Sequence, residues 1–186
     1  MRKRVFVVHG WGFNSNMNWY NWLKEQLERK NFEVKILEMP NTEEPKIKEW
    51  VNFLSKSVGK SDKNTYFIGH SIGCQTIMRY LQKINSKIGG AFFVAGWFNL
   101  INLEDKEVEK IAEPWLKTKI NFTKVKNNIN KLTVVLSDND PYNCLEENTR
   151  IFKEKLNAKV IIEKNKGHFT SQDGGKNLEF GLKQFF

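Results

Sequence analysis

The sequence is poor in cysteine and histidine, with 2 cysteines and 3 histidines among its 186 residues. The two thiols, Cys74 and Cys144, are too few for a disulfide framework, and neither has the spacing of a metal-binding motif. So few thiol and imidazole groups argue against a zinc site. We therefore expect no metal and no cofactor, and we expect both thiols to be reduced.

Long hydrophobic runs are also missing. The apolar stretches are strand-sized, which excludes a membrane-spanning helix. At the N-terminus, basic residues precede the apolar segment Val5–Val8, which is too short for the core of a secretory signal. We interpret this segment as a first strand and expect a cytoplasmic protein with no membrane partner.

Acidic residues are outnumbered, and the formal net charge is +9. A basic balance can indicate nucleic-acid binding. Here the lysines are scattered and often adjoin acids, as in Lys24-Glu25 and Lys153-Glu154-Lys155. This pattern is typical of a solvated surface. We expect no nucleic-acid partner, and a monomer or a weak homo-oligomer.

Short apolar runs alternate with helical patterns along the chain. The runs that predict strands are Val5–Val8, Val34–Leu37, Tyr66–Ile68, Ala91–Ala95, Leu132–Leu136 and Val160–Ile162. Helical spacing appears in four groups: Trp19, Leu23 and Leu27; Cys74, Ile77, Leu81 and Ile84; Ile151, Phe152 and Leu156, in a helix beginning near Asn143; and Leu178, Leu182 and Phe185. Consecutive apolar residues are typical of strands buried on both faces. The alternation predicts one α/β domain over residues 1–186, with a six-stranded, mostly parallel sheet flanked by helices on both faces.

The longest interval between predicted strands covers residues 96–130. It contains a charged helical stretch at Leu103–Ala112, then Pro114-Trp115, then a second helical stretch near Phe122–Ile129. We expect this insertion to cap a site at the sheet edge. The alternative is a long crossover with no role in a site.

The segment Gly69-His70-Ser71-Ile72-Gly73 follows a predicted strand and precedes a predicted helix. A serine in this G-x-S-x-G pattern lies on a sharp strand-to-helix turn that exposes its Oγ above the sheet. The N–H of Ile72 would lie at the helix N-terminus, where free donors stabilise an oxyanion. The context predicts that Ser71 is a nucleophile; the alternative is a glycine-flanked turn with an incidental serine.

A nucleophilic serine needs a general base. In this kind of fold the chain order is serine, acid, histidine, and His168 is the one histidine after Ser71. His70 adjoins Ser71, so its side chain should point away from Oγ and pack beneath the turn, and His9 ends the first predicted strand. We therefore predict His168 as the base, with activity that rises as its imidazole loses a proton.

The acid should follow the predicted strand Leu132–Leu136, where Asp138 and Asp140 both lie. We favour Asp140, which lies further along the loop and directly before Pro141. Asp138 stays an alternative, because it could instead form an Asx-type turn. Asp105, in the insertion, is a third candidate.

The loop after the first predicted strand contains Gly10 and Gly12, which allow close approach of the backbone to a substrate. The N–H of Trp11 is our candidate for the second oxyanion donor, beside that of Ile72. Aromatic residues are predicted at the same edge, and they suggest an apolar acyl pocket: Phe13, Trp97, Phe98, Trp115, Tyr142 and Phe169.

Motifs spread over nearly the whole chain occur in a characteristic order: His9–Gly12, Asn18–Leu23, Met39-Pro40, Gly69–Gly73, Pro114-Trp115, Asp138–Pro141 and Gly167–Phe169. This order resembles the small serine hydrolases related to retinoblastoma-binding protein 9 and the bacterial YdeN-like proteins. The resemblance implies a compact α/β-hydrolase fold without a large lid domain. It also implies a triad of Ser71, Asp140 and His168, with the acid directly before the proline. The segment Glu104–Glu113 departs from the family by being longer and more charged.

These features predict a serine hydrolase that cleaves a small acyl ester through an acyl-enzyme. The bond could equally be a thioester or an amide, because the motifs are the same. The alternative is a protein-interaction module with a vestigial site, since the related family is associated with binding a partner protein.

Overall fold

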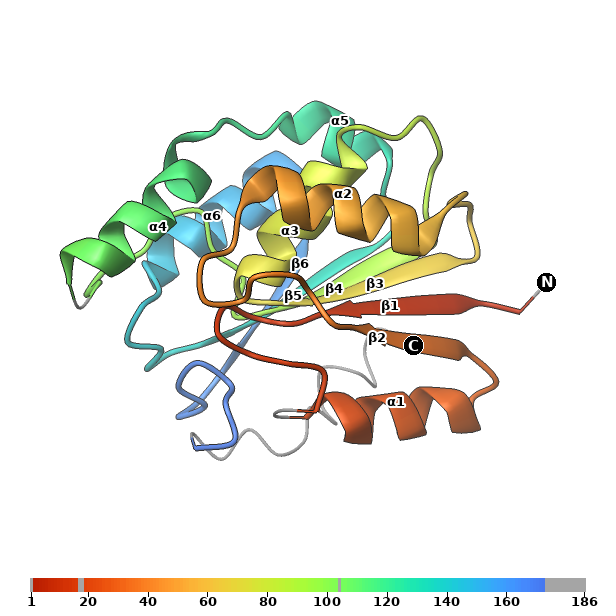
Figure 1. The fold of residues 1–186 in the computed structure, drawn as a ribbon, viewed down its shortest axis with the longest axis horizontal. Coiled ribbons are helices and arrows are strands. Elements are labelled where there is room, and N and C mark those ends of the chain that lie inside the picture. Colours follow the sequence, from red (N-terminus) through yellow and green to blue (C-terminus); the bar gives the residue numbers. More distant parts are fainter. Residues whose placement is uncertain (1, 17–18, 104, 173–186) are drawn as a thin grey trace.

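The computed structural model describes residues 2–16, 19–103 and 105–172. Strands and helices alternate along the chain as predicted (Figure 1). The elements are β1 (Arg4–Val8), α1 (Tyr20–Arg29), β2 (Glu33–Leu37), α2 (Ile47–Val58), β3 (Thr65–His70), α3 (Ile72–Leu81), β4 (Gly90–Val94), α4 (Lys106–Lys117), α5 (Phe122–Asn127), β5 (Leu132–Ser137), α6 (Leu145–Leu156) and β6 (Lys159–Glu163). The predicted helix around Leu178–Phe185 lies outside the described residues.

The 6-stranded sheet has the order β2-β1-β3-β4-β5-β6. Every pair of neighbouring strands is parallel, so the predicted α/β fold with a mostly parallel sheet is confirmed. The central strands β4 and β5 are buried at every residue. Burial on both faces explains why these strands are apolar at consecutive positions.

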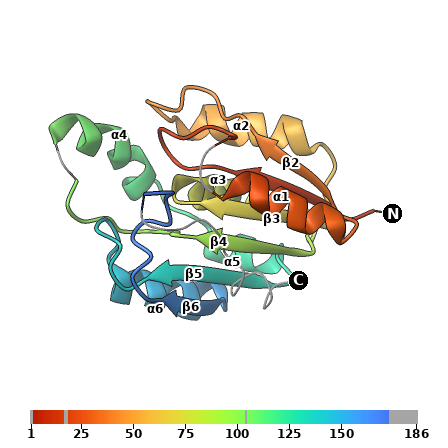
Figure 2. The same ribbon diagram turned by 90° about the horizontal axis from the view of Figure 1, so that it is seen from below.

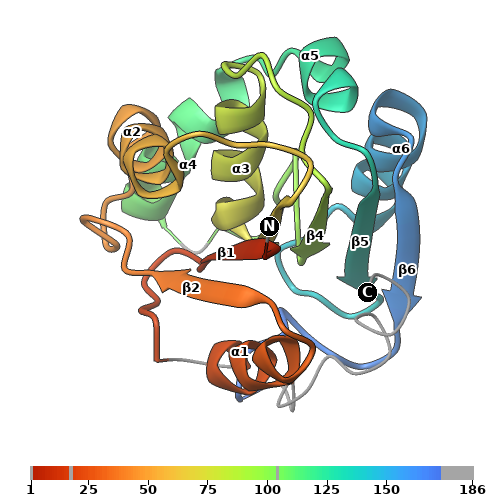
Figure 3. The ribbon, with the colours of Figure 1, turned by 90° about the vertical axis from the view of Figure 1, so that its right-hand side faces the viewer.

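Helices cover both faces of the sheet (Figures 1 and 3). Helices α2, α3, α5 and α6 share one core with one face, and Trp50, Ile77 and Phe152 are buried there. On the other face, Leu23 and Leu27 of α1 are buried in a second core. The two apolar clusters hold the sheet between layers of helices.

Two features of the helices were not predicted. Helix α2 was missed, although Trp50, Leu54 and Val58 recur at four-residue spacing and are buried. Helix α4 continues through Pro114 to Lys117, whereas the sequence suggested an end before the proline. Proline removes one backbone hydrogen bond from a helix. The turn of α4 that contains Pro114 also contains Trp115, whose side chain is buried in the core.

The carboxyl ends of the strands form the edge where a site is expected. β1 lies next to β3 in the sheet. The chain leaves β1 toward α1 on one face and leaves β3 toward α3 on the other face, which opens a crevice between the two strand ends. Figure 2 shows α4 beyond this edge. No helix in the described part of the chain is long and apolar enough to cross a membrane. Cys74 and Cys144 are free thiols.

Candidate active site

Ser71 occupies the sharp turn between β3 and α3, with φ 52° and ψ −121°. This conformation is strained for a residue with a side chain. A Cβ on Gly69 would lie 2.8 Å from the backbone nitrogen of Cys74, and a Cβ on Gly73 would lie 2.3 Å from the carbonyl oxygen of Val8. Both positions therefore need glycine, because α3 begins in close contact with β1 and β3.

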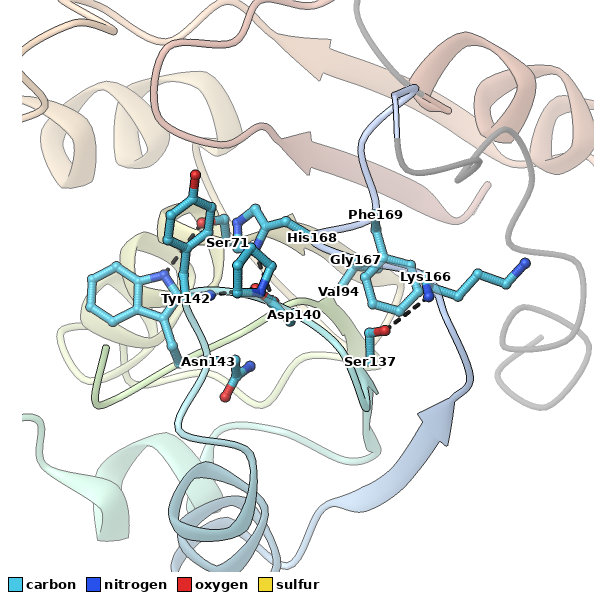
Figure 4. Close-up of polar contacts among 12 residues, drawn as sticks. Ser71, Val94, Ser137, Asp140, Tyr142, Asn143, Lys166, Gly167, His168 and Phe169 are labelled. Carbon is cyan, nitrogen blue, oxygen red and sulfur yellow. Dashed lines mark hydrogen bonds and ion pairs between the residues drawn. The ribbon is translucent and has the colours of Figure 1, made fainter. Parts of the chain in front are cut away.

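His168 lies on the loop after β6 and contacts Asp140. Its Nδ1 is 2.8 Å from Oδ2 of Asp140, and the Asp140 side chain is 0% exposed. The other carboxylate oxygen accepts the N–H of Tyr142 at 3.0 Å. Because a carboxylate only accepts, the imidazole donates to Asp140 from Nδ1. Figure 4 shows the imidazole between Asp140 and Ser71.

The other candidate acids have different partners. Asp138 Oδ1 accepts the backbone N–H of Asn165 at 2.8 Å, and so fastens the loop that leads to His168. Asn139 Oδ1 accepts the N–H of Gly167 at 2.8 Å on the same loop. Asp105 Oδ1 caps α4 by accepting backbone N–H groups of its first turn. Of the three aspartates, Asp140 is the one placed against His168.

His70 lies beneath the elbow in a buried chain of hydrogen bonds. Its Nε2–H donates to the carbonyl of His168 at 2.8 Å, and Nδ1 accepts the hydroxyl of Tyr20 at 2.8 Å. The same hydroxyl accepts the N–H of Gly10 at 3.4 Å. Burial, followed by the nearby His168, lowers the pKa of His70 to about 3. A neutral His70 thus connects the glycine loop to the loop of His168.

The glycine loop runs beside the elbow. A Cβ on Gly10 would lie 3.5 Å from Cβ of Ser71. The N–H of Gly12 donates to a backbone carbonyl at 2.9 Å. Among the described residues, the backbone N–H groups of Trp11 and of Ile72, the first residue of α3, donate to no hydrogen-bond acceptor. Two free donors near Ser71 are suited to hold an oxyanion.

A family model described as serine hydrolase matches residues 5–186. The chain belongs to this family. It is 25% identical to the YdeN protein of Bacillus subtilis (strain 168) over 183 residues, 96% of this chain and 92% of the relative. It is 24% identical to the serine hydrolase RBBP9 of Rattus norvegicus over 174 residues, 92% of this chain and 89% of the relative. The resemblance inferred from the motifs is thereby confirmed.

Solved structures show the same fold. The crystal structure of the ydeN gene product from B. subtilis has a TM-score of 0.89 at 23% identity, with 98% of this chain and 96% of that chain covered. The carboxylesterase CesB (YbfK) from Bacillus subtilis has a TM-score of 0.64 at 11% identity, with 99% and 82% covered. Both likenesses support the α/β-hydrolase architecture.

In this serine hydrolase, Ser71 and His168 line a cavity of 720 Å³ at the carboxyl edge of the sheet. This size is ordinary for a small-molecule pocket. Of the predicted pocket residues, Phe13, Trp97 and Tyr142 line the cavity, and so do the predicted oxyanion donors Trp11 and Ile72. Within the insertion, the cavity lining extends only as far as Ile111 of α4, whereas α5 packs its Val125 into the core. The first part of the insertion therefore lines the cavity, as far as α4.

Three aromatic residues predicted for the pocket lie elsewhere. Trp115 is 1% exposed and packs edge-on against Trp50 with ring centroids 6.1 Å apart. Because α4 continues past Pro114, Trp115 falls on its core-facing side. Phe98 belongs to the same core. Phe169 is 1% exposed and belongs to the core of α1, whereas its neighbour His168 lines the cavity.

Acidic side chains gather at the cavity of this basic serine hydrolase. Glu43, Glu44, Asp105 and Glu107 line it, and no lysine or arginine of the described residues does so. The described part of the chain contains no cluster of three or more histidine, cysteine or acidic side chains suited to a metal ion.

Two contacts of the site were missed by sequence reasoning. One is the series of hydrogen bonds that connects Gly10, Tyr20, His70 and His168. His70 and His168 are 98 positions apart in the sequence, so no local pattern indicates their contact. Trp97 was expected only as a pocket wall, but its Nε1–H donates to Oγ of Ser71 at 3.3 Å. Both contacts depend on how loops from different strands meet at one edge.

Proposed function

We propose that this serine hydrolase cleaves small acyl esters through an acyl-enzyme on Ser71. One observation carries the proposal: a buried carboxylate, Asp140, holds Nδ1 of His168 at 2.8 Å, while the imidazole lies beside a serine on a strained turn (Figure 4). A serine becomes a useful nucleophile when an adjacent base can take its proton and a third group orients that base.

In the proposed first step, Ser71 Oγ attacks the ester carbonyl and its proton passes to Nε2 of His168. Asp140 stabilises the imidazolium that forms. The carbonyl electrons move onto oxygen, where the N–H groups of Trp11 and Ile72 hold the negative charge. When the intermediate collapses, His168 protonates the departing alcohol. Water, deprotonated by His168, then releases the acid and restores Ser71.

The cavity supports an apolar acyl group of modest size. Its 720 Å³ accommodates more than an acetyl group, and apolar side chains of the elbow, the glycine loop and α4 form much of its wall. Among the structural neighbours, CesB carries the description of a carboxylesterase, in keeping with ester substrates for this chain.

Replacing the nucleophile is the first test. Ser71→Ala should lower kcat for p-nitrophenyl butyrate roughly 10³- to 10⁶-fold, because the residual rate comes from substrate binding and oxyanion donors alone. The wild-type protein should be labelled by a fluorophosphonate probe, and Ser71→Ala should not. Unchanged ester hydrolysis by purified Ser71→Ala would refute the proposal. A folded wild-type protein that resists the probe would favour the interaction module instead.

Asp140 and Asp138 allow a matched test of which aspartate orients His168. Asp140→Asn should lower kcat roughly 10²- to 10⁴-fold, because the amide can donate to Nδ1 and favour the wrong imidazole tautomer. Asp138→Asn should retain most activity, because its amide oxygen still accepts the N–H of Asn165. Equal losses in the two variants would contradict the assignment of the acid.

A further inference from the structure

The indole of Trp97 touches the oxygen that attacks. Its Nε1 lies 3.3 Å from Oγ of Ser71 with the N–H directed at that oxygen. We propose that Trp97 is a further catalytic residue, whose N–H orients the nucleophile and stabilises the charge that develops on Oγ. The inference rests on the proposed function, since it needs Ser71 to be the nucleophile.

The fold holds Trp97 firmly in this position. β4 ends at Val94, and Ala95 has a φ of 48°, which turns the chain out of the strand direction. The carbonyl of Trp97 accepts the side-chain N–H of Gln75 at 2.9 Å, so α3 anchors the turn. Trp97 is only 2% exposed, and a buried indole N–H requires an acceptor. Here the acceptor is the reacting atom itself.

The chemistry of the two groups sets the direction of the hydroxyl proton. A serine hydroxyl has one donor and two acceptor positions, whereas an indole N–H can only donate. The contact with Trp97 therefore uses a lone pair of Ser71 and leaves the O–H free to donate to His168. The indole neither accepts nor supplies a proton in the reaction.

The contact should strengthen as the reaction begins. When the O–H bond of Ser71 breaks and the proton moves to His168, negative charge grows on Oγ before the bond to the carbonyl carbon is complete. A hydrogen bond to a charged acceptor is roughly twice as strong as one to a neutral acceptor. An interaction that is stronger in the transition state than in the ground state accelerates the reaction. The indole N–H of Trp97 donates to Oγ, while the backbone N–H groups of Trp11 and Ile72 donate to the carbonyl oxygen of the substrate.

The test compares Trp97→Phe with Trp50→Phe. Trp50 is also fully buried and donates its indole N–H, to the carbonyl of Pro40 at 2.7 Å, but it lies outside the cavity. A small fluorophosphonate measures activation of Ser71 without engaging the acyl pocket. Trp97→Phe should be labelled roughly 10-fold more slowly at the pH plateau, with the midpoint of the pH–rate curve unchanged. Trp50→Phe should be labelled at the wild-type rate per folded molecule.

A second variant separates the N–H from packing. Benzothienylalanine at position 97 keeps the shape of tryptophan and replaces the N–H by sulfur, and it should show the same 10-fold slower labelling. Wild-type labelling rates in both position-97 variants would overturn the inference while leaving the proposed function intact. A shifted pH midpoint would also overturn it, because the residue would then act by moving His168. A wild-type protein without labelling would instead overturn the proposed function itself.

Discussion

His70 connects the glycine loop to the loop of His168, and the proposed reaction needs both loops in place. Its ring donates to the backbone of His168 and accepts from Tyr20, whose hydroxyl in turn accepts the N–H of Gly10. The carbonyl of His168 can only accept, so Nε2 carries a proton, and in the neutral ring Nδ1 is therefore the acceptor. Burial makes the cation costly, which is the main reason that the pKa of His70 falls to about 3.

The depressed pKa of His70 predicts a loss of stability in weak acid. An unfolded histidine titrates near pH 6.5, whereas His70 in the folded protein titrates at about 3. Below about pH 6.5 the unfolded chain thus binds a proton that the folded chain does not. The free energy of unfolding should fall with decreasing pH, with a limiting slope of ~1.4 kcal/mol per pH unit from this group.

Urea unfolding at pH 7, 6 and 5 measures this dependence. His70→Gln preserves one donor and one acceptor without the titration, so its stability should depend less steeply on pH. His9, whose pKa is also lowered by burial, is present in both proteins and cancels in the comparison. Identical slopes for wild type and His70→Gln would contradict the prediction.

At the scale of elements, the elbow depends on how closely α3 approaches β1. Gly73 lies in the first turn of α3, where a Cβ would be 2.3 Å from the carbonyl oxygen of Val8 and 2.8 Å from that of His9. These atoms belong to the backbone at the start of the glycine loop. The free N–H groups of Ile72 and Trp11 lie on the two segments that this contact holds together.

A methyl group at Gly73 should therefore affect both folding and chemistry. Gly73→Ala is expected to lower the free energy of unfolding by about 1–3 kcal/mol through overpacking, and to lower kcat at least 10-fold per folded molecule. Gly59, at the end of α2, has a φ of 62° and open space around its missing Cβ. Gly59→Ala should cost ~1–3 kcal/mol from backbone strain alone, with unchanged kcat. Normal activity in folded Gly73→Ala would contradict this account of the elbow.

For the whole molecule, the charge at the cavity is opposite to the net charge. The chain carries +9, yet Glu43, Glu44, Asp105 and Glu107 line the cavity without a lysine or arginine among the described lining residues. Local charges act over about 8–10 Å at physiological salt, so the acidic side chains that line the cavity act most strongly on a substrate at Ser71. Such a field disfavours anionic substrates.

Matched esters test this selectivity. p-Nitrophenyl valerate and p-nitrophenyl hemiglutarate have acyl chains of equal length, and the second ends in a carboxylate. At low ionic strength kcat/KM for the anionic ester should be roughly 5- to 10-fold lower, and the difference should shrink with added salt. Glu44→Gln combined with Glu107→Gln should reduce the difference in kcat/KM between the two esters. Glu113→Gln, on α4 but outside the cavity lining, should not. A faster reaction with the anionic ester would contradict the prediction.

Several features could be predicted because they are local. Consecutive apolar residues located each of the six strands of the sheet. The glycines around Ser71 indicated a sharp strand-to-helix turn, and the chain order left His168 as the candidate base. The same local approach failed at Trp115, where an aromatic residue next to a proline was interpreted as a pocket wall. Helix α2 has a local signal of the same kind, in the four-residue spacing of Trp50, Leu54 and Val58.

The sequence by itself determined the order of the strands, the α/β class and the membership of the serine hydrolase family. These follow from burial patterns and short motifs, which depend on neighbours in the chain. Only the tertiary structure decided which aspartate contacts His168, that Trp115 and Phe169 belong to the cores, and that the N–H of Trp97 reaches Ser71. Such contacts join loops that follow different strands, and their geometry is set by the parallel sheet that brings all the carboxyl ends to one edge.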